Sequence, residues 1–105
     1  MGYETDLKLF IDGVWKSGEG RDAHTVLNPV NASPIAEVPY ATAADLEEAL
    51  EASNRAWPEW HSTDVEKRGA ILHKAAALMR ERIDVIAATM TQEQGKILSE
   101  AKAEV

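Results

Sequence analysis

The chain has 105 residues, 45% of them hydrophobic and 28% charged, which is typical of one small globular domain. Eighteen acidic residues against eleven basic ones give a net charge of −7, which argues against nucleic acid and anionic membranes as partners. There is no cysteine, so disulfides, thiolate metal sites and a cysteine nucleophile are excluded within these residues. The N-terminal residues lack the basic and apolar regions of a signal peptide, and no membrane span is evident, so we expect a cytoplasmic protein.

Residues 1–41 are expected to form short strands and turns. Apolar residues recur at every second position over residues 7–11, which predicts a strand with one apolar face. Asp12-Gly13 follows, and this dipeptide favours a tight hairpin turn because both of its positions need a positive φ. Residues 14–15 should therefore return antiparallel to the first strand.

Two further short strands are predicted, at residues 24–28 and 35–38. Prolines limit both of them, because proline cannot donate a hydrogen bond to a sheet. Between the hairpin and the first of these strands, residues 18–23 fit G-x-G-x-x-A, the phosphate-binding pattern of dinucleotide folds. That pattern works only where a helix N-terminus follows it, and here a strand is predicted, so we interpret the segment as a surface loop.

The helical segment covers residues 42–105 and begins with a predicted capping pair, Thr42 and Asp45. Apolar residues on one face continue to Trp57. Pro58 is expected to end this helix, because a proline disfavours helical geometry in the residue before it.

The main feature of the segment is an amphipathic helix predicted from about residue 63 to residue 94. Thr63 and Glu66 fit a capping box at its start. A single rod of this size would be roughly 46 Å long, so we expect a break near residues 81–84, and Gly95 suits the C-terminal end. Its apolar face has spacings of four and three and is formed mainly by Val65, Gly69, Leu72, Ala76, Met79, Ile83, Ile86 and Met90.

Together these elements predict an α+β fold that is mostly α-helical, with short N-terminal strands and a hairpin followed by three to four helices, the last starting near residue 97. The rest of the chain offers too little to cover the apolar face of the long helix. Because each buried Leu, Ile or Met side chain contributes roughly 1.5–3 kcal/mol, we expect an incomplete domain that self-associates as a homo-oligomer or stays partly molten.

No residue pattern supplies the chemistry of a complete enzyme. The three histidines, His24, His61 and His73, lack the close helical spacing that would put two of them on one face, so we interpret them as ordinary surface or half-buried side chains. The carboxylates lie mainly on the polar faces of the helices, where no acid–base pair can be chosen from spacing. On the residues alone, a small acidic helical protein-interaction module is therefore an alternative function.

Four segments, in this order and at these separations, resemble the N-terminal part of an NAD(P)-dependent aldehyde dehydrogenase: LFIDGVW, LNPVNASPIAEVPYAT, WPEWHSTDVEKRGAIL and TQEQGKILSEAKAEV. The tetrapeptide EQGK at residues 93–96, with Ala101 and Glu104 after it, is most similar to the succinate-semialdehyde dehydrogenase branch. The resemblance covers nearly all of the chain. The coding sequence after residue 105 distinguishes the two functions. A glycine-rich cofactor-binding segment and a cysteine there would favour the dehydrogenase, and a stop codon without them would favour the interaction module.

The resemblance implies an α/β aldehyde dehydrogenase fold in a longer parent, with this chain as a truncated N-terminal part of the cofactor-binding domain. The parent would oxidise a small-molecule aldehyde, such as succinate semialdehyde, to the carboxylic acid with NAD or NADP. In the family a cysteine thiolate attacks the aldehyde, and a glutamate activates the water that releases the product. Those residues belong to later parts of the family's chain, so no catalytic or cofactor-binding residue is assigned here, and we expect an inactive fragment that binds no cofactor.

One binding site is carried over from the family. Some members bind a structural monovalent cation through backbone carbonyls before the Asn-Pro turn and an acidic residue after the Gly-Lys motif. The matching residues are Val26, Leu27 and Glu104. The remaining ligands would come from later parts of the family's chain, so we do not expect this chain alone to fill the site.

Overall fold

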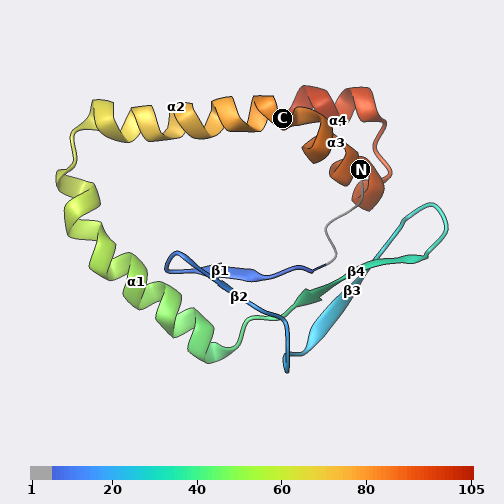
Figure 1. The fold of residues 1–105 in the computed structure, drawn as a ribbon, viewed down its shortest axis with the longest axis horizontal. Coiled ribbons are helices and arrows are strands. Elements are labelled where there is room, and N and C mark those ends of the chain that lie inside the picture. Colours follow the sequence, from blue (N-terminus) through green and yellow to red (C-terminus); the bar gives the residue numbers. More distant parts are fainter. Residues whose placement is uncertain (1–5) are drawn as a thin grey trace. The chain divides into compact units, whose positions relative to one another are not determined.

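The computed structural model describes residues 6–105, and within them it contains four strands and four helices (Figure 1). Strands come first and helices follow, which confirms the predicted α+β class. The elements are β1 (Leu9–Ile11), β2 (Val14–Lys16), β3 (Ala23–Leu27), β4 (Pro34–Pro39), α1 (Ala43–Ser62), α2 (Val65–Glu81), α3 (Ile83–Gln94) and α4 (Leu98–Glu104).

The described chain divides into two compact units. The hairpin unit contains residues 6–25 and 36–63, and therefore β1, β2 and α1. The helical unit contains Val26–Ile35 and Asp64–Val105, and therefore α2, α3 and α4. None of the helices described in the two units is long and apolar enough to cross a membrane.

The first hairpin is confirmed. β1 and β2 pair antiparallel, with Phe10 opposite Trp15, and their ring centroids lie 4.7 Å apart. Asp12 and Gly13 form the turn with φ angles of 50° and 77°. Both angles are positive, as a tight primed turn requires, so this dipeptide determines where the chain reverses.

β3 and β4 form a second two-stranded sheet. The turn between them is closed by Asn28, whose backbone N–H donates to the Ser33 carbonyl at 2.8 Å and whose side-chain oxygen accepts from the Val30 N–H at 2.9 Å. The two predicted strands are thus confirmed within a residue or two. Prolines occupy both ends of β4, where the missing N–H is tolerated.

Helix α1 begins where predicted and ends later than predicted. The hydroxyl of Thr42 accepts from the Asp45 N–H at 3.2 Å, and the Asp45 carboxylate accepts from the Thr42 N–H at 2.8 Å, which confirms the capping box. Pro58 does not end the helix. It lies inside α1, which continues to Ser62, because the helix tolerates the loss of one backbone hydrogen bond at this position.

The predicted capping box at the start of α2 is wrong. Because α1 continues to Ser62, Thr63 is its C-cap, and the Thr63 hydroxyl donates back to the Glu59 carbonyl at 2.7 Å. The cap of α2 is Asp64, whose side chain accepts from the Glu66 N–H at 2.8 Å. Both residues are of types that favour helix caps. Thr63 caps the end of α1 and Asp64 caps the start of α2, and the spacing in the sequence does not show which residue serves which helix.

The expected break in the long helix is confirmed at Arg82. This residue separates α2 from α3 with a φ of −103° and a ψ of 13°. Gly95 then ends α3 in the left-handed region with a φ of 73°, also as predicted. After a short extended segment, α4 begins at Leu98.

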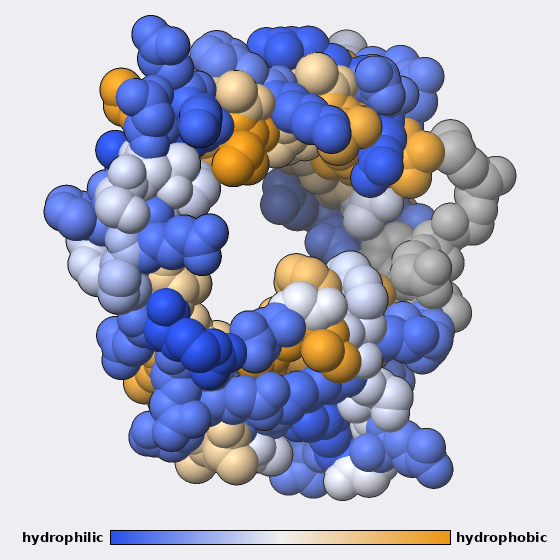
Figure 2. Space-filling view, turned by 60° about the vertical axis from the view of Figure 1, so that its left-hand side comes forward, coloured by the Kyte–Doolittle hydropathy of each residue, from blue (hydrophilic) through white to orange (hydrophobic). Residues whose placement is uncertain are grey.

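Few side chains of the described residues are buried. The buried hydrophobic residues are three alanines, Ala36, Ala87 and Ala101. Many larger apolar side chains are exposed instead. Figure 2 shows hydrophobic residues in orange at the surface, among hydrophilic ones. Because large buried side chains contribute most of the hydrophobic stabilisation of a domain, the described chain lacks an ordinary core.

The cap of α1 gives a first testable prediction. Thr42→Ala removes the hydroxyl that accepts from Asp45 N–H, and it should lower the free energy of unfolding by about 1 kcal/mol, as is usual for a lost N-cap. Ser53→Ala is the matched control, because the Ser53 hydroxyl donates to the Ala49 carbonyl inside the same helix and caps nothing. Urea unfolding measures both, and equal midpoints for the two variants would contradict the role of Thr42.

Candidate functional site

The most constrained group of side chains surrounds Asp45 at the N-terminus of α1, in the hairpin unit. Asp45 is 4% exposed, and it is the buried charged residue of the described chain. One carboxylate oxygen accepts from both the backbone N–H and the hydroxyl of Thr42, at 2.8 and 2.7 Å. Asp45 therefore completes the capping box of Thr42 and carries a charge in a nearly water-free position.

Two basic side chains compensate this charge. The Arg21 guanidinium donates to both carboxylate oxygens of Asp45, with Nη2 3.0 Å from Oδ1. The Lys16 ammonium lies 3.4 Å from Oδ1 and also pairs with Glu48 on the next turn of α1. Bidentate pairing of this kind fixes direction as well as charge, so β2 and the loop after it are attached to the start of α1.

Arg21 also holds the loop that surrounds it. Its Nε donates to the Ser17 carbonyl at 3.2 Å, and Nη1 lies 3.4 Å from the Tyr40 carbonyl. Close by, the Tyr40 N–H donates to the Asp22 carbonyl at 2.8 Å. One guanidinium thus joins two stretches of backbone that are distant in sequence, through the fork of donors that only arginine offers.

The pKa of the Asp45 carboxyl lies well below its usual value. The Arg21 side-chain hydrogen bonds contribute most to this shift, followed by the backbone and hydroxyl hydrogen bonds from Thr42. A carboxylate held in this way is a poor proton acceptor near neutral pH. Because its ionised form is satisfied by several donors, we interpret the cluster as structural.

The sequence indicated only the Thr42–Asp45 part of this cluster. Arg21 and Lys16 were missed because both lie more than twenty residues from Asp45, with sequence separations of 24 and 29. The one local sign of a role for Lys16 and Arg21 is that they stand on either side of the Gly18–Gly20 stretch, next to acidic residues. Such loops are common, so this signal does not single out a partner.

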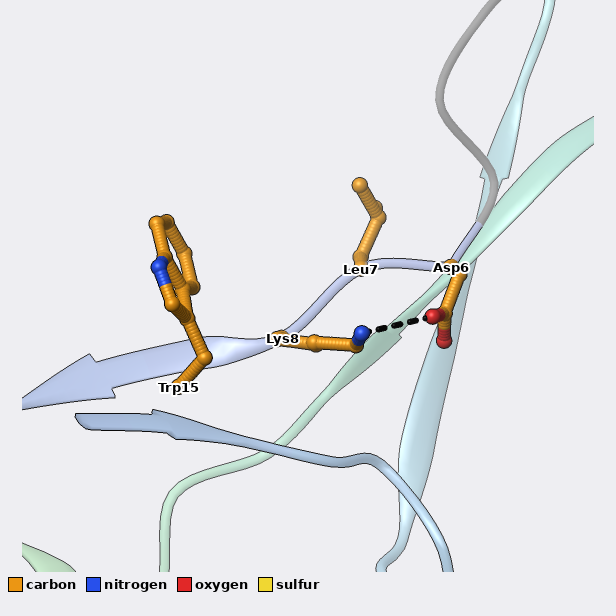
Figure 3. A pocket seen from close by; sticks show the side chains of 4 residues that line it. All are labelled: Asp6, Leu7, Lys8 and Trp15. Carbon is orange, nitrogen blue, oxygen red and sulfur yellow. Dashed lines mark ion pairs between the residues drawn. The ribbon is translucent and has the colours of Figure 1, made fainter.

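A cavity of about 450 Å³ lies beside the start of β1 (Figure 3). Leu7 and Trp15 project to the same side of the strands, whereas Lys8 extends toward Asp6 and its ammonium lies 2.9 Å from that carboxylate. These four residues line the cavity. The cavity thus combines an apolar lining with an ion pair in which the Lys8 ammonium is bound to the Asp6 carboxylate.

The glycine-rich loop at residues 18–23 does not fit a nucleotide phosphate. It leads into β3 and not into a helix, which agrees with the interpretation as a surface loop. The adjoining cavity of about 360 Å³ is lined by the carboxylates of Asp6, Glu19 and Glu37, which would repel a pyrophosphate. The described part of this loop therefore lacks the helix N-terminus that would hold a pyrophosphate, and the adjoining cavity is lined by acidic residues.

The three predicted cation ligands all lie in the helical unit. Val26 and Leu27 belong to β3, and the Glu104 carboxylate, on the last turn of α4, pairs with the Lys96 ammonium. Within residues 6–105, no three His, Cys, Asp or Glu side chains gather as a metal-binding group. A site built on backbone carbonyls is of a different kind, so the assignment of Val26, Leu27 and Glu104 stays a prediction.

Comparison with known proteins supports the resemblance noted in the sequence. The sequence profile of the aldehyde dehydrogenase family matches residues 15–105. A malonate-semialdehyde dehydrogenase of Bacillus pumilus is 39% identical over 99 residues, which cover 94% of this chain and 20% of the relative. The NADP-dependent succinate-semialdehyde dehydrogenase of Escherichia coli is 39% identical over 98 residues, 93% of this chain and 20% of the relative.

Solved structures agree with the sequence matches. The crystal structure of lactaldehyde dehydrogenase from Escherichia coli superposes with a TM-score of 0.90 at 32% identity, over 97% of this chain and 21% of that one. The chain thus spans about a fifth of the length of the relatives that it matches. By its profile, its relatives and its backbone, this chain belongs to the aldehyde dehydrogenase family.

Proposed function

We propose that this chain is the N-terminal portion of an NAD(P)-dependent dehydrogenase that oxidises an aldehyde to the carboxylic acid. The observation that carries the proposal is the family match over residues 15–105, which also favours it over a small interaction module. Because the 105 residues contain no cysteine, the nucleophile of such an enzyme would come from the rest of the polypeptide. The chain would then form an incomplete N-terminal part of the cofactor-binding domain.

We further infer that the substrate is a semialdehyde, an aldehyde with an acid group at its other end. Support comes from the names of the relatives, which include malonate-semialdehyde, succinate-semialdehyde and N-succinylglutamate 5-semialdehyde dehydrogenases. A 3-sulfolactaldehyde dehydrogenase of Pseudomonas putida, 36% identical, adds a sulfonate-bearing aldehyde. Succinate semialdehyde is the substrate we would test first, with lactaldehyde as the comparison that lacks the acid group.

The contribution of this chain to the reaction would be structural. The Asp45 cluster fixes the start of α1, and the described residues offer no fitting pyrophosphate site at their glycine pair. When bound by the whole enzyme, the nicotinamide cofactor would accept the hydride. This chain would support the domain that holds the cofactor and would not touch the reacting atoms.

The proposal predicts that the purified 105-residue chain forms no NADH or NADPH from succinate semialdehyde. A chimera can be made in which this chain replaces the matching N-terminal fifth of the Escherichia coli succinate-semialdehyde dehydrogenase. The proposal predicts that this chimera oxidises succinate semialdehyde. Absorbance at the wavelength of the reduced cofactor measures both. Aldehyde-dependent reduction by the isolated chain, or a folded chimera without activity, would contradict the proposed function.

A further inference from the structure

The turn between β1 and β2 contains a dipeptide whose two residues can react with each other. Asp12 is followed by Gly13, whereas every other aspartate and asparagine of the chain is followed by a larger residue. When the Asp12 carboxyl carbon, Cγ, bonds to the backbone nitrogen of the next residue, the product is a five-membered ring. Because glycine has no side chain, that nitrogen is less shielded here than after any other aspartate.

The structure leaves this dipeptide open to solvent. A Cβ built on Gly13 would have no described atom within 4 Å, apart from those of its chain neighbours, and the Asp12 side chain is 50% exposed. Asp12 also has a φ of 50°, and this left-handed conformation costs free energy that local opening of the turn would release. The described residues therefore do not enclose the reacting atoms.

An ion pair restrains the Asp12 side chain. Its Oδ2 accepts from Nη2 of Arg55, on α1, at 2.6 Å, and both residues belong to the hairpin unit. While this hydrogen bond is present, one carboxylate oxygen is held at the guanidinium, and Cγ cannot turn freely toward the Gly13 nitrogen. Arg55 therefore opposes ring closure.

We propose that Asp12 is a site of spontaneous covalent modification, isomerisation to isoaspartate, and that Arg55 slows this reaction. The Gly13 nitrogen attacks Cγ of the protonated carboxyl group. An N–Cγ bond forms, a Cγ–O bond breaks, and the hydroxyl leaves with the amide proton as water. The product is a succinimide ring.

Water then opens the ring at one of its two carbonyls. Opening at the Cγ carbonyl restores aspartate. Opening at the backbone carbonyl leaves the chain running through Cγ, which is isoaspartate, with the former backbone carbonyl as a free carboxylate. The whole conversion is an isomerisation without any oxidant or cofactor, so the inference is independent of the proposed function.

Isoaspartate would change the hairpin. It adds one carbon to the backbone between Asp12 and Gly13, so the two-residue turn no longer matches the strands that it joins. The pairing of Phe10 with Trp15, whose ring centroids lie 4.7 Å apart, depends on the register that this turn sets. The modified chain should therefore lose part of its aromatic circular dichroism.

The test compares Arg55→Ala with Thr42→Ala in the purified 105-residue chain, incubated at neutral pH. Arg55→Ala releases the Asp12 carboxylate. Thr42→Ala is the matched control, because it weakens the same helix through its cap and leaves the Arg55–Asp12 pair in place. Peptide mapping by chromatography and mass spectrometry separates isoaspartate from aspartate of equal mass and detects the succinimide, which is lighter by one water.

Isoaspartate should accumulate at residue 12 faster than at the other aspartates. Arg55→Ala should accelerate its formation roughly two- to fivefold over wild type, because an exposed ion pair changes an equilibrium by only such a factor. Thr42→Ala should remain closer to wild type. A peptide of residues 7–16, which lacks Arg55, should react at least as fast as the Arg55→Ala chain.

Equal rates in wild type and Arg55→Ala would overturn the role of Arg55. So would an equal acceleration by Thr42→Ala, because loosening of α1 and not release of the carboxylate would then explain the effect. An unmodified residue 12 in Arg55→Ala, or faster modification at another aspartate, would overturn Asp12 as the site.

Discussion

Asp45→Ala should destabilise the hairpin unit more than any other substitution considered for this chain. The change removes the carboxylate that accepts from the Thr42 N–H in the capping box. It also leaves Arg21 and Lys16 without their shared carboxylate, although their side chains are only 18% and 23% exposed. Removing one partner of a buried ion pair costs more than the pair itself contributes, because the remaining charge stays poorly solvated. The loss should therefore exceed the effect of Thr42→Ala, which leaves the ion pairs in place.

Asp45→Asn separates the cap from the charge. The side-chain oxygen of asparagine can still accept from the Thr42 N–H, so the capping box can remain. It cannot neutralise Arg21. We expect a stability between those of wild type and Asp45→Ala, measured by urea unfolding at pH 7. If Asp45→Asn unfolds together with wild type, the ion pairs add nothing and the cap alone explains the burial of Asp45.

The same cluster makes stability depend on pH in a definite direction. The pKa of Asp45 is lowered in the folded chain, chiefly by Arg21, so the unfolded state takes up a proton first as the solution is acidified. The contribution of Asp45 is thus fully present above the ordinary carboxyl pKa of about 3.9 and is lost progressively below it. The difference in unfolding free energy between wild type and Asp45→Asn should be constant from pH 7 to about pH 5 and shrink below about pH 4. A difference that widens on acidification would contradict this sign.

Local sequence features predicted local structure well in this chain. Asp12-Gly13, Thr42 with Asp45, and Gly95 each determine a backbone conformation within a few residues, and each was found where expected. The break between α2 and α3 was also expected, because one continuous helix would have been long for a compact domain.

The errors arose where two local preferences competed or where the partner is distant. Pro58 is predicted to end α1, but the other interactions of the helix outweigh the loss of one backbone hydrogen bond. Because α1 continues to Ser62, Asp64 and not Thr63 caps α2. Arg21 pairs with Asp45 across 24 residues, a contact that no periodicity predicts. The candidate site was therefore visible in the sequence only as a helix cap, and its charge compensation came from the fold.

Replacement by alanine should lower the free energy of unfolding at Gly95 and raise it at Gly69. Gly95 has a φ of 73°, in the left-handed region where a side chain is strained, whereas Gly69 lies inside α2 with open space around it. Gly95→Ala should lower the free energy of unfolding by about 1–2 kcal/mol, because an L-residue is disfavoured in that conformation. Gly69→Ala should raise it by about 0.5–1 kcal/mol, because alanine loses less conformational freedom than glycine on entering a helix.

The geometry near Gly95 makes the source of its effect testable. A Cβ at this position would lie 3.4 Å from Cγ of Pro29, which is ordinary van der Waals contact, so the strain comes from the backbone and not from a clash. Gly95→Asn should then cost less than Gly95→Ala, because asparagine adopts the left-handed conformation more readily although its side chain is larger. Urea unfolding of the three variants ranks these effects. If Gly95→Asn is the less stable of the two, steric contact with Pro29 and not φ decides the residue at this helix end.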